Sequence, residues 1–176
     1  MLIIADGEDV RDLVPTDDPS IRLIHLDRAD PIGDKRNFGC ERADGEIIVH
    51  FDDDDWSAPG RVADQVARLA TCAKAVTGYR RLRFTDGPSW WLYKGMPESV
   101  PGTTQCYRRD WWERHHFPRV QLAEDIQFAQ AAHAAGELDR GPGPDAGELM
   151  YATIHAQNTS PRQLSGPSWQ KLETAA

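Results

Sequence analysis

Residues 35–56 read KRNFGCERADGEIIVHFDDDDW, and this stretch decides the expected fold. Its apolar run, Ile47–Phe51, is followed directly by four aspartates, Asp52–Asp55. An apolar run that ends in carboxylates predicts a buried strand whose acids lie at the edge of a sheet, where open α/β sheets bind ligands. Adjacent carboxylates repel one another unless a cation offsets their charge. A solvated acidic turn is the ordinary alternative, but the position behind a buried strand favours a metal site.

Predicted strands and helices alternate through the first half of the chain. Apolar runs predict strands at 2–5, 22–26, 46–51, 75–84, 103–107 and 148–155, and helical patterns predict helices at 35–43, 61–73, 109–115 and 124–135. This alternation implies an α/β fold with a mixed, mostly parallel sheet flanked by helices. We expect a single domain at 1–162, with a nucleotide- and metal-binding half at 1–73 and a substrate-binding half at 74–162, followed by a flexible tail at 163–176.

Charge and composition limit the partners of the chain. The net charge of −8 over 176 residues disfavours a general nucleic-acid-binding surface, although a local basic groove remains open. No apolar stretch approaches the roughly 20 residues that cross a bilayer, and Met1–Ala5 is too short for a signal peptide. Cys40, Cys72 and Cys106 contain no C-x-x-C pair, which favours reduced thiols in a cytoplasmic protein.

The aspartate run and the helix before it predict a phosphorylated ligand. Oxygen ligands suit Mg²⁺ or Mn²⁺, and Mg²⁺ commonly takes only one or two carboxylates and shares the rest of its coordination with phosphates and water. Lys35, Arg36 and Asn37 open a predicted helix, where backbone N–H groups and the helix dipole favour anions. These three residues therefore predict a diphosphate contact, with a solvated helix start as the equal alternative.

Three other groups have a structural and a functional interpretation. Glu124 and Asp125 open a predicted helix, where acids commonly only stabilise the dipole, but a carboxylate there can also act as a general base. The tryptophan pairs at 90–91 and 111–112 could stack on sugars, although core packing is favoured. His155 follows a predicted strand and by default is a structural histidine.

Taken together, these segments resemble the inverting glycosyltransferases of family 2, which have the GT-A fold. Residues 35–56 are similar to the family's K-R-N…A-x-G-E-I-I…D-x-D segment, and Glu124-Asp125 is similar to its E-D motif. Residues 102–109 resemble the acceptor-side region, and His155 with Asn158-Thr159-Ser160 resembles the closing His and N-T-S of some members. The resemblance covers about residues 2 to 162.

The resemblance implies a role for each matching residue. Asp6 would contact the nucleotide base or ribose, and Asp52 and Asp53 would hold the ribose or support the metal. Asp54 would coordinate Mn²⁺ or Mg²⁺ on the diphosphate, with Asp52 and His155 completing that site. Asp125 would deprotonate the acceptor hydroxyl while the metal stabilises the departing nucleoside diphosphate. The implied activity is transfer from a nucleotide-diphosphate sugar, with a UDP-sugar as the expected donor, and inversion at the anomeric carbon.

The acceptor stays open, since a lipid, a polysaccharide, a small molecule, a protein or a nucleic-acid base could each supply the accepting group. The chain also departs from the family pattern, because the usual first strand and helix precede the strand matched here by Leu2–Ala5. An N-terminally truncated GT-A fold is therefore expected. Leu2–Ala5 could shift to pair with Glu46–Phe51, or another chain such as a second copy could complete the sheet.

Two other functions remain as alternatives. The departure from the family pattern is also compatible with a catalytically weak or inactive nucleotide-sugar-binding remnant that acts through oligomerisation or a partner chain. A metal-dependent phosphohydrolase is the third interpretation of the acidic cluster. Release of phosphate from simple esters would distinguish the hydrolase from a transferase.

Overall fold

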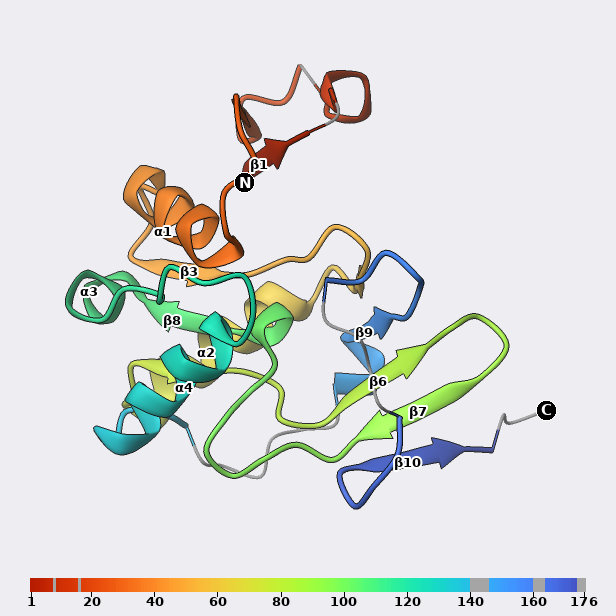
Figure 1. Cartoon of the computed structure of the whole chain (residues 1–176). Coiled ribbons are helices and arrows are strands. Elements are labelled where there is room, and N and C mark those ends of the chain that lie inside the picture. The colour runs from red at the N-terminus through yellow and green to blue at the C-terminus, as the bar shows by residue number, and fades with distance from the viewer. Residues whose placement is uncertain (8, 16, 140–145, 160–163, 174–176) are drawn as a thin grey trace.

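The computed structural model describes residues 1–176 except 8, 16, 140–145, 160–163 and 174–176 (Figure 1). The chain begins with a small parallel unit in which β1 (Leu2–Asp6) pairs with β2 (Arg22–Leu26), and the short helix η1 (Arg11–Leu13) lies in the connection between them. Helix α1 (Ile32–Arg42) then leads to β3 (Ile47–Val49).

Helix α1 joins the N-terminal unit to the body of the molecule. Gly39 faces β1, where a Cβ added to it would lie 3.7 Å from Ile4 Cγ1. One residue further, the thiol of Cys40 lies 3.1 Å from the hydroxyl of Tyr107. The start of the helix lies against the chain near residue 118, because a Cβ on Gly33 would be only 1.9 Å from the backbone oxygen of Pro118. Glycine is therefore required at this first turn.

Two further sheets form the body. In the three-stranded sheet, β8 (Cys106–Arg108) lies between β3 and β5 (Val76–Thr77) and is antiparallel to both. The five-stranded sheet has the order β10-β7-β6-β9-β4. Its strands are β4 (Trp56–Ser57), β6 (Leu82–Thr85), β7 (Trp90–Tyr93), β9 (Met150–Thr153) and β10 (Trp169–Leu172).

The remaining helices connect these sheets. They are α2 (Arg61–Cys72), α3 (Arg109–Arg114) and α4 (Glu124–Ala134), with the 3₁₀ turns η2 (Gly102–Thr104) and η3 (Ala146–Glu148). Two clusters of buried side chains form the core. One contains Trp111, Trp112 and Phe128 near α3 and α4, and the other contains Phe84 and Met150 beneath the five-stranded sheet. Core packing thus accounts for the tryptophan pair at 111–112.

The α/β class and the GT-A type of architecture are confirmed, but the expected proportion of parallel strands is corrected. Among the described strands, only the pairs β1–β2 and β6–β9 are parallel. The predicted strand at 75–84 divides into β5 and β6, and β6 continues into β7 through the short segment 86–89. So short a connection permits only antiparallel pairing, because a parallel crossover needs a dozen or more residues.

Two further expectations are corrected by the strand pairing. Strand β10 lies within the segment expected to be a flexible tail, and it pairs with β7 while Trp169 packs against Phe84 and Tyr93. The shift of Leu2–Ala5 onto the strand before the aspartates does not occur, because β1 pairs with β2 and β3 pairs with β8.

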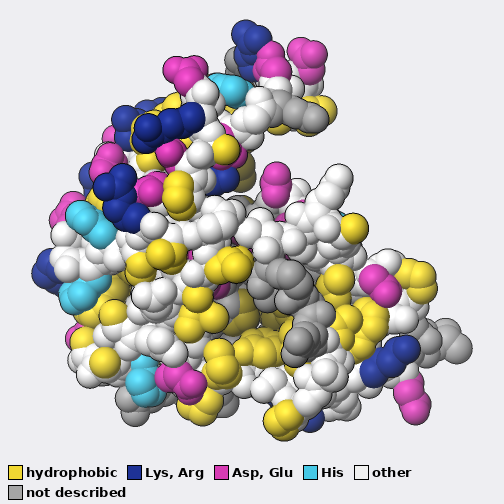
Figure 2. All heavy atoms as spheres, viewed as in Figure 1, with side chains coloured by type: hydrophobic (Ala, Val, Ile, Leu, Met, Phe, Trp, Pro, Cys, Tyr) yellow, Lys and Arg dark blue, Asp and Glu magenta, His cyan; other side chains and the backbone are white. Residues whose placement is uncertain are grey.

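Figure 2, viewed as in Figure 1, shows a hollow in the surface between the N-terminal unit and the body.

Two properties of the described residues bear on environment. None of the described helices is both long enough and apolar enough to cross a bilayer. All three cysteines are free thiols, and Cys40 and Cys106 are buried.

Candidate active site

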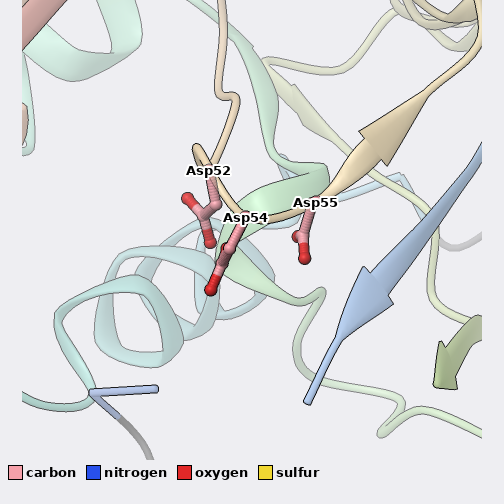
Figure 3. Close-up of side chains that lie close together, drawn as sticks. All are labelled: Asp52, Asp54 and Asp55. Atoms are coloured by element: carbon pink, nitrogen blue, oxygen red, sulfur yellow. The ribbon is translucent and has the colours of Figure 1, made fainter. Parts of the chain in front are cut away.

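Three of the four aspartates form a compact group where the chain turns between β3 and β4. Asp52, Asp54 and Asp55 each offer one carboxylate oxygen, and these oxygens lie within 4.8 Å of one another (Figure 3). Asp53 is exposed and lies outside this group. An all-oxygen donor set with this spacing fits a hard divalent cation such as Mg²⁺ or Mn²⁺.

Asp54 is held by residues that follow β9. His155 Nε2 and Asn158 Nδ2 each lie 2.9 Å from Asp54 Oδ2. The structure therefore brings His155 to the acidic group, more than one hundred residues away in sequence. Asn158 had no predicted role of its own, although the Asn158-Thr159-Ser160 motif contained the signal. A cation at Asp54 would lie beside an imidazole and an amide that orient the carboxylate.

Asp55 braces the turn. The Thr103 hydroxyl donates to Asp55 Oδ2 at 2.6 Å, and the Thr153 backbone N–H donates to Oδ1 at 3.0 Å. Burial raises the pKa of Asp55 to about 6, more than these hydrogen bonds lower it. Asp55 thus ties the acidic turn to η2 and β9.

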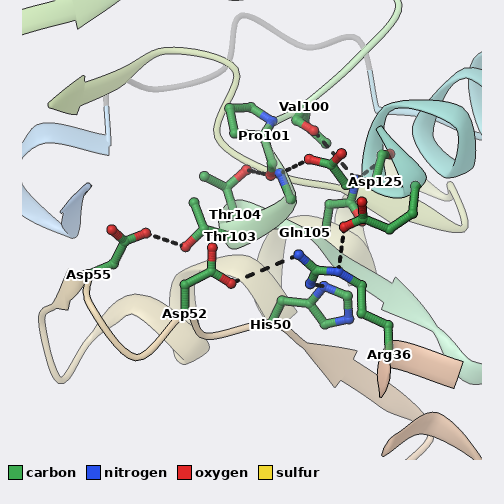
Figure 4. A network of polar contacts seen from close by, with 12 residues as sticks. Arg36, His50, Asp52, Asp55, Val100, Pro101, Thr103, Thr104, Gln105 and Asp125 are labelled. Carbon is green, nitrogen blue, oxygen red and sulfur yellow. Dashed lines mark hydrogen bonds and ion pairs between the residues drawn. The ribbon is translucent and has the colours of Figure 1, made fainter. Parts of the chain in front are cut away.

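Arg36 lies at the centre of a buried charge network beside the acids (Figure 4). Its guanidinium donates from Nε to Glu124 Oε1 at 2.9 Å, and Nη2 lies 3.9 Å from Asp52 Oδ1. Burial opposes the charge of Arg36, but Asp52, Glu124 and Asp125 outweigh that effect and raise its pKa. Burial raises the pKa values of Asp52 and Glu124 above their ordinary values, although Arg36 lowers both. Glu124, matched earlier only as the first half of a motif, is thus the ion-pair partner of Arg36.

His50 continues this network into the core. Arg36 Nη1 lies 2.5 Å from His50 Nδ1, and His50 Nε2 lies 2.7 Å from the Tyr107 hydroxyl. Because a guanidinium has only donors, His50 Nδ1 must accept, and the proton lies on Nε2. Burial, reinforced by Arg36, holds the pKa of His50 well below its ordinary value. His50 is therefore a neutral link between Arg36 and the core.

The other two residues of the Lys-Arg-Asn segment have separate contacts. Lys35 Nζ lies 3.0 Å from Asp6 Oδ1, so the two residues predicted on the nucleotide side are paired. The Asn37 side chain donates to the Phe117 carbonyl and accepts from Phe117 N and Trp112 Nε1, each at 2.9 Å. Asn37 thus fixes the chain between α3 and α4.

Asp125 is oriented by two backbone donors. Gly102 N donates to Asp125 Oδ2 at 2.9 Å, and Ile126 N donates to Oδ1 at 2.8 Å. A Cβ added to Gly102 would lie 2.6 Å from the same Oδ2 atom, so only glycine permits this approach. Gln105 Nε2 donates to the Asp125 carbonyl at 2.9 Å. Asp125 and Asp52 are close enough that the charge of Asp125 raises the pKa of Asp52.

Arg61 has no exposed surface and braces the acidic turn from beneath. It donates to Ser57 Oγ at 2.8 Å, to the His50 carbonyl at 2.7 Å and to the Thr103 carbonyl. Arg61 also donates to Gln65 Oε1 at 3.1 Å, so all of these acceptors are neutral. Two of them, His50 and Ser57, lie on either side of the aspartates in the chain. The site as a whole combines a group of three carboxylates, an oriented fourth carboxylate on Asp125, and the buried guanidinium of Arg36, which offsets part of their charge.

Comparisons with known proteins identify the family and the fold. The family model described as glycosyl transferase family 2 matches residues 5–127. No curated protein sequence matches the chain. Two solved structures share the fold: Staphylococcus aureus TarS 1-349 in complex with UDP-GlcNAc, and the mannosyltransferase PcManGT from Pyrobaculum calidifontis in complex with GDP-Man and Mn²⁺.

Both likenesses are remote in sequence. TarS 1-349 is 19% identical with a TM-score of 0.56, and the match covers 77% of this chain and 42% of that one. PcManGT is 18% identical with a TM-score of 0.56, and the match covers 76% of this chain and 39% of that one. The chain thus spans less than half the length of these two structures, and the likeness concerns the fold.

Proposed function

This chain belongs to glycosyltransferase family 2, and on that premise we propose that it moves a sugar from a nucleotide-diphosphate sugar, a UDP-sugar, to an acceptor hydroxyl. The observation that carries the proposal is the acid group after β3, which lies within the electrostatic reach of Asp125 and is balanced by buried Arg36. The nucleotide sugars in the two solved complexes, UDP-GlcNAc and GDP-Man, support the class of donor.

Asp54 and Asp52 would hold Mn²⁺ or Mg²⁺, with His155 beside them. The donor set supports this assignment, and the PcManGT complex contains Mn²⁺. A bound divalent cation would offset the charge of the departing diphosphate. Asp53, exposed beside the group, would face the ribose.

On the nucleotide side, Lys35 and Asp6 are the proposed contacts, because their ion pair lies partly exposed at the end of β1. The positive charge of Arg36, which lies beside Asp52 and Glu124, would attract the diphosphate. Asn37 would support this site indirectly, by fixing the chain near Phe117.

Asp125 would act as the general base. Backbone N–H groups that donate to both of its oxygens fix its direction, while each oxygen keeps a further lone pair. The proton of the acceptor hydroxyl would pass to Asp125 as the hydroxyl oxygen attacks the anomeric carbon and the nucleoside diphosphate leaves. A single displacement of this kind inverts the anomeric configuration.

The proposal is tested by mixing the protein with Mn²⁺ and a panel of UDP- and GDP-sugars and measuring nucleotide release and nucleotide binding. Asp54→Ala should abolish metal-dependent nucleotide binding, and Asp125→Asn should reduce turnover by at least roughly 100-fold while preserving binding. Asp110 is exposed on α3 and pairs with Arg114, so Asp110→Ala and Asp110→Asn are matched controls that should change neither property.

Each other outcome has a defined meaning. Nucleotide binding without transfer would support the nucleotide-sugar-binding remnant instead, and phosphate release from simple esters would support a hydrolase. A folded protein that neither binds nor turns over any nucleotide sugar would refute the proposal. The cytoplasm is the proposed location, since three free thiols fit a reducing compartment.

A further inference from the structure

The five-stranded sheet has one face in the core and an opposite face with aromatic side chains. Phe84 and Met150 point into the core cluster. Because side chains alternate along a strand, Tyr151 points to the other face, and Trp56 lies directly opposite Tyr151 in the pairing of β4 with β9. Trp90 reaches the same group from β7. We call Trp56, Tyr151 and Trp90 the aromatic platform.

Contacts between the three rings of the platform fix their orientations. Trp56 and Tyr151 are stacked, with centroids 5.2 Å apart and planes inclined by 11°. Trp90 meets Tyr151 edge-on, with centroids 5.1 Å apart and an angle of 77°. Trp56 is nevertheless 43% exposed. Since Tyr151 covers one face of the indole, the opposite face is left as a flat, preorganised apolar surface.

The platform adjoins the acid group through the strands that carry it. Trp56 directly follows Asp55 and lies two residues beyond Asp54, so their Cα atoms are at most roughly 7 Å apart. On the neighbouring strand, Tyr151 is four residues before His155, whose Nε2 lies 2.9 Å from Asp54 Oδ2. A molecule lying on Trp56 would therefore lie beside the acid group that would hold the metal.

We propose that the aromatic platform binds the acceptor, and that the acceptor is a carbohydrate whose pyranose ring stacks on Trp56. The inference rests on the proposed function, since it names the substrate that receives the sugar. A pyranose has an apolar face of C–H groups and a rim of hydroxyls. The exposed indole face suits the C–H groups, and the hydroxyl rim stays in contact with water.

A lipid chain fits this surface less well. An alkyl chain gains from a continuous apolar groove, whereas the exposed indole lies next to charged carboxylates on a strand of only two residues. A planar ring supported from behind by a second ring is suited to a planar, rigid ligand, because little conformational freedom is lost on binding.

The test separates acceptor binding from donor chemistry. Binding of gluco-, manno- and N-acetylglucosamine oligosaccharides is measured by calorimetry without donor, and transfer is measured with Mn²⁺ and the UDP-sugar. Trp56→Ala should weaken oligosaccharide binding and raise the acceptor KM by about tenfold, while nucleotide binding and donor hydrolysis stay unchanged. Trp56→Phe should restore most of the affinity because it keeps a flat ring.

Leu13→Ala is the control, because Leu13 is 81% exposed and lies in η1, far from β4 in the chain. Equal acceptor KM values for the wild type and Trp56→Ala, or transfer to a peptide or to sugar-free lipid micelles but to no oligosaccharide, would overturn the platform proposal and leave the proposed function intact. Absence of donor binding would instead refute the proposed function, and the calorimetric arm would still decide whether the platform binds oligosaccharides.

Discussion

At the scale of single residues, His50 shows how the site is coupled to the core. Its ring lies between the guanidinium of Arg36 and the hydroxyl of Tyr107, and it is neutral because a protonated ring would place two cations in contact. Protonation would also occupy Nδ1, the ring nitrogen that accepts the hydrogen bond from Arg36. The folded protein is therefore more stable when the His50 ring is neutral than when it is protonated.

This coupling predicts a pH dependence. The folded pKa of His50 lies well below 6.5, the ordinary value to which it returns on unfolding. The stabilisation is fully present above about pH 6.5 and decreases as the pH falls below it, because the unfolded chain then binds the additional proton, with a slope of at most about 1.4 kcal/mol per pH unit.

Urea unfolding between pH 7.5 and pH 5 measures this effect. His50→Asn places an amide oxygen where Nδ1 accepts and removes the titrating ring. The difference in unfolding free energy between the wild type and this variant should shrink as the pH falls. A difference that stays constant over this range would show that His50 takes up its proton equally in the folded and unfolded protein, so that folding does not lower its pKa.

At the scale of elements, the contact between η2 and α4 determines where the proposed base lies. The backbone of Gly102 approaches Asp125 so closely that a methyl group would lie 2.6 Å from its carboxylate oxygen and 2.8 Å from its Cβ. The start of α4 and the η2 turn can therefore pack this closely only because residue 102 is glycine. Neither element would hold the carboxylate in this position alone.

Gly102→Ala should consequently displace Asp125. We expect turnover to fall by roughly 100-fold, in line with a shift of about 1 Å at a reacting group, while nucleotide affinity changes little. Steady-state kinetics and nucleotide titration together measure the two effects. Gly60→Ala is the matched control, since a Cβ there meets nothing closer than 3.9 Å. Loss of nucleotide binding in Gly102→Ala would instead point to a general collapse of the site.

At the scale of the whole molecule, the N-terminal unit and the body present strand edges that are free among the described residues. Strand β1 pairs with β2 alone and β3 pairs with β8 alone, and every residue of β1 and β3 is half-buried. Apolar edge strands of this kind are prone to pair with another chain. A second copy is the partner that we propose for this edge.

Light scattering over a range of protein concentrations tests this proposal. The wild type should associate as its concentration rises, and Ile3→Lys, which places a charge on β1, should favour the monomer. The matched change His25→Lys on β2 should leave association unchanged. Purely monomeric wild-type protein would contradict pairing through β1, and sensitivity only to His25→Lys would move the interface to β2.

The sequence by itself determined the features that depend on local pattern. The four acids predict a cation site after β3, which stays a prediction, with three of their carboxylates close together. The apolar run before Asp52 predicted the strand, and the family resemblance was confirmed by the match over residues 5–127. These two inferences held because strand period and motif spacing act between neighbours in the chain. The antiparallel pairings and the ordered strand β10 were missed because pairing depends on distant partners.

Only the tertiary structure decided which side chains meet. The family resemblance had already implied that His155 lies at the site of Asp54, where the structure places it. The structure alone placed Asn158 on Asp54, Glu124 on Arg36, and Tyr151 beneath Trp56. No local signal specifies these contacts, because each joins two residues that lie between 88 and 104 positions apart in the chain. The sequence thus supplied the chemical groups, and the packing of sheets and helices selected which of them share one site.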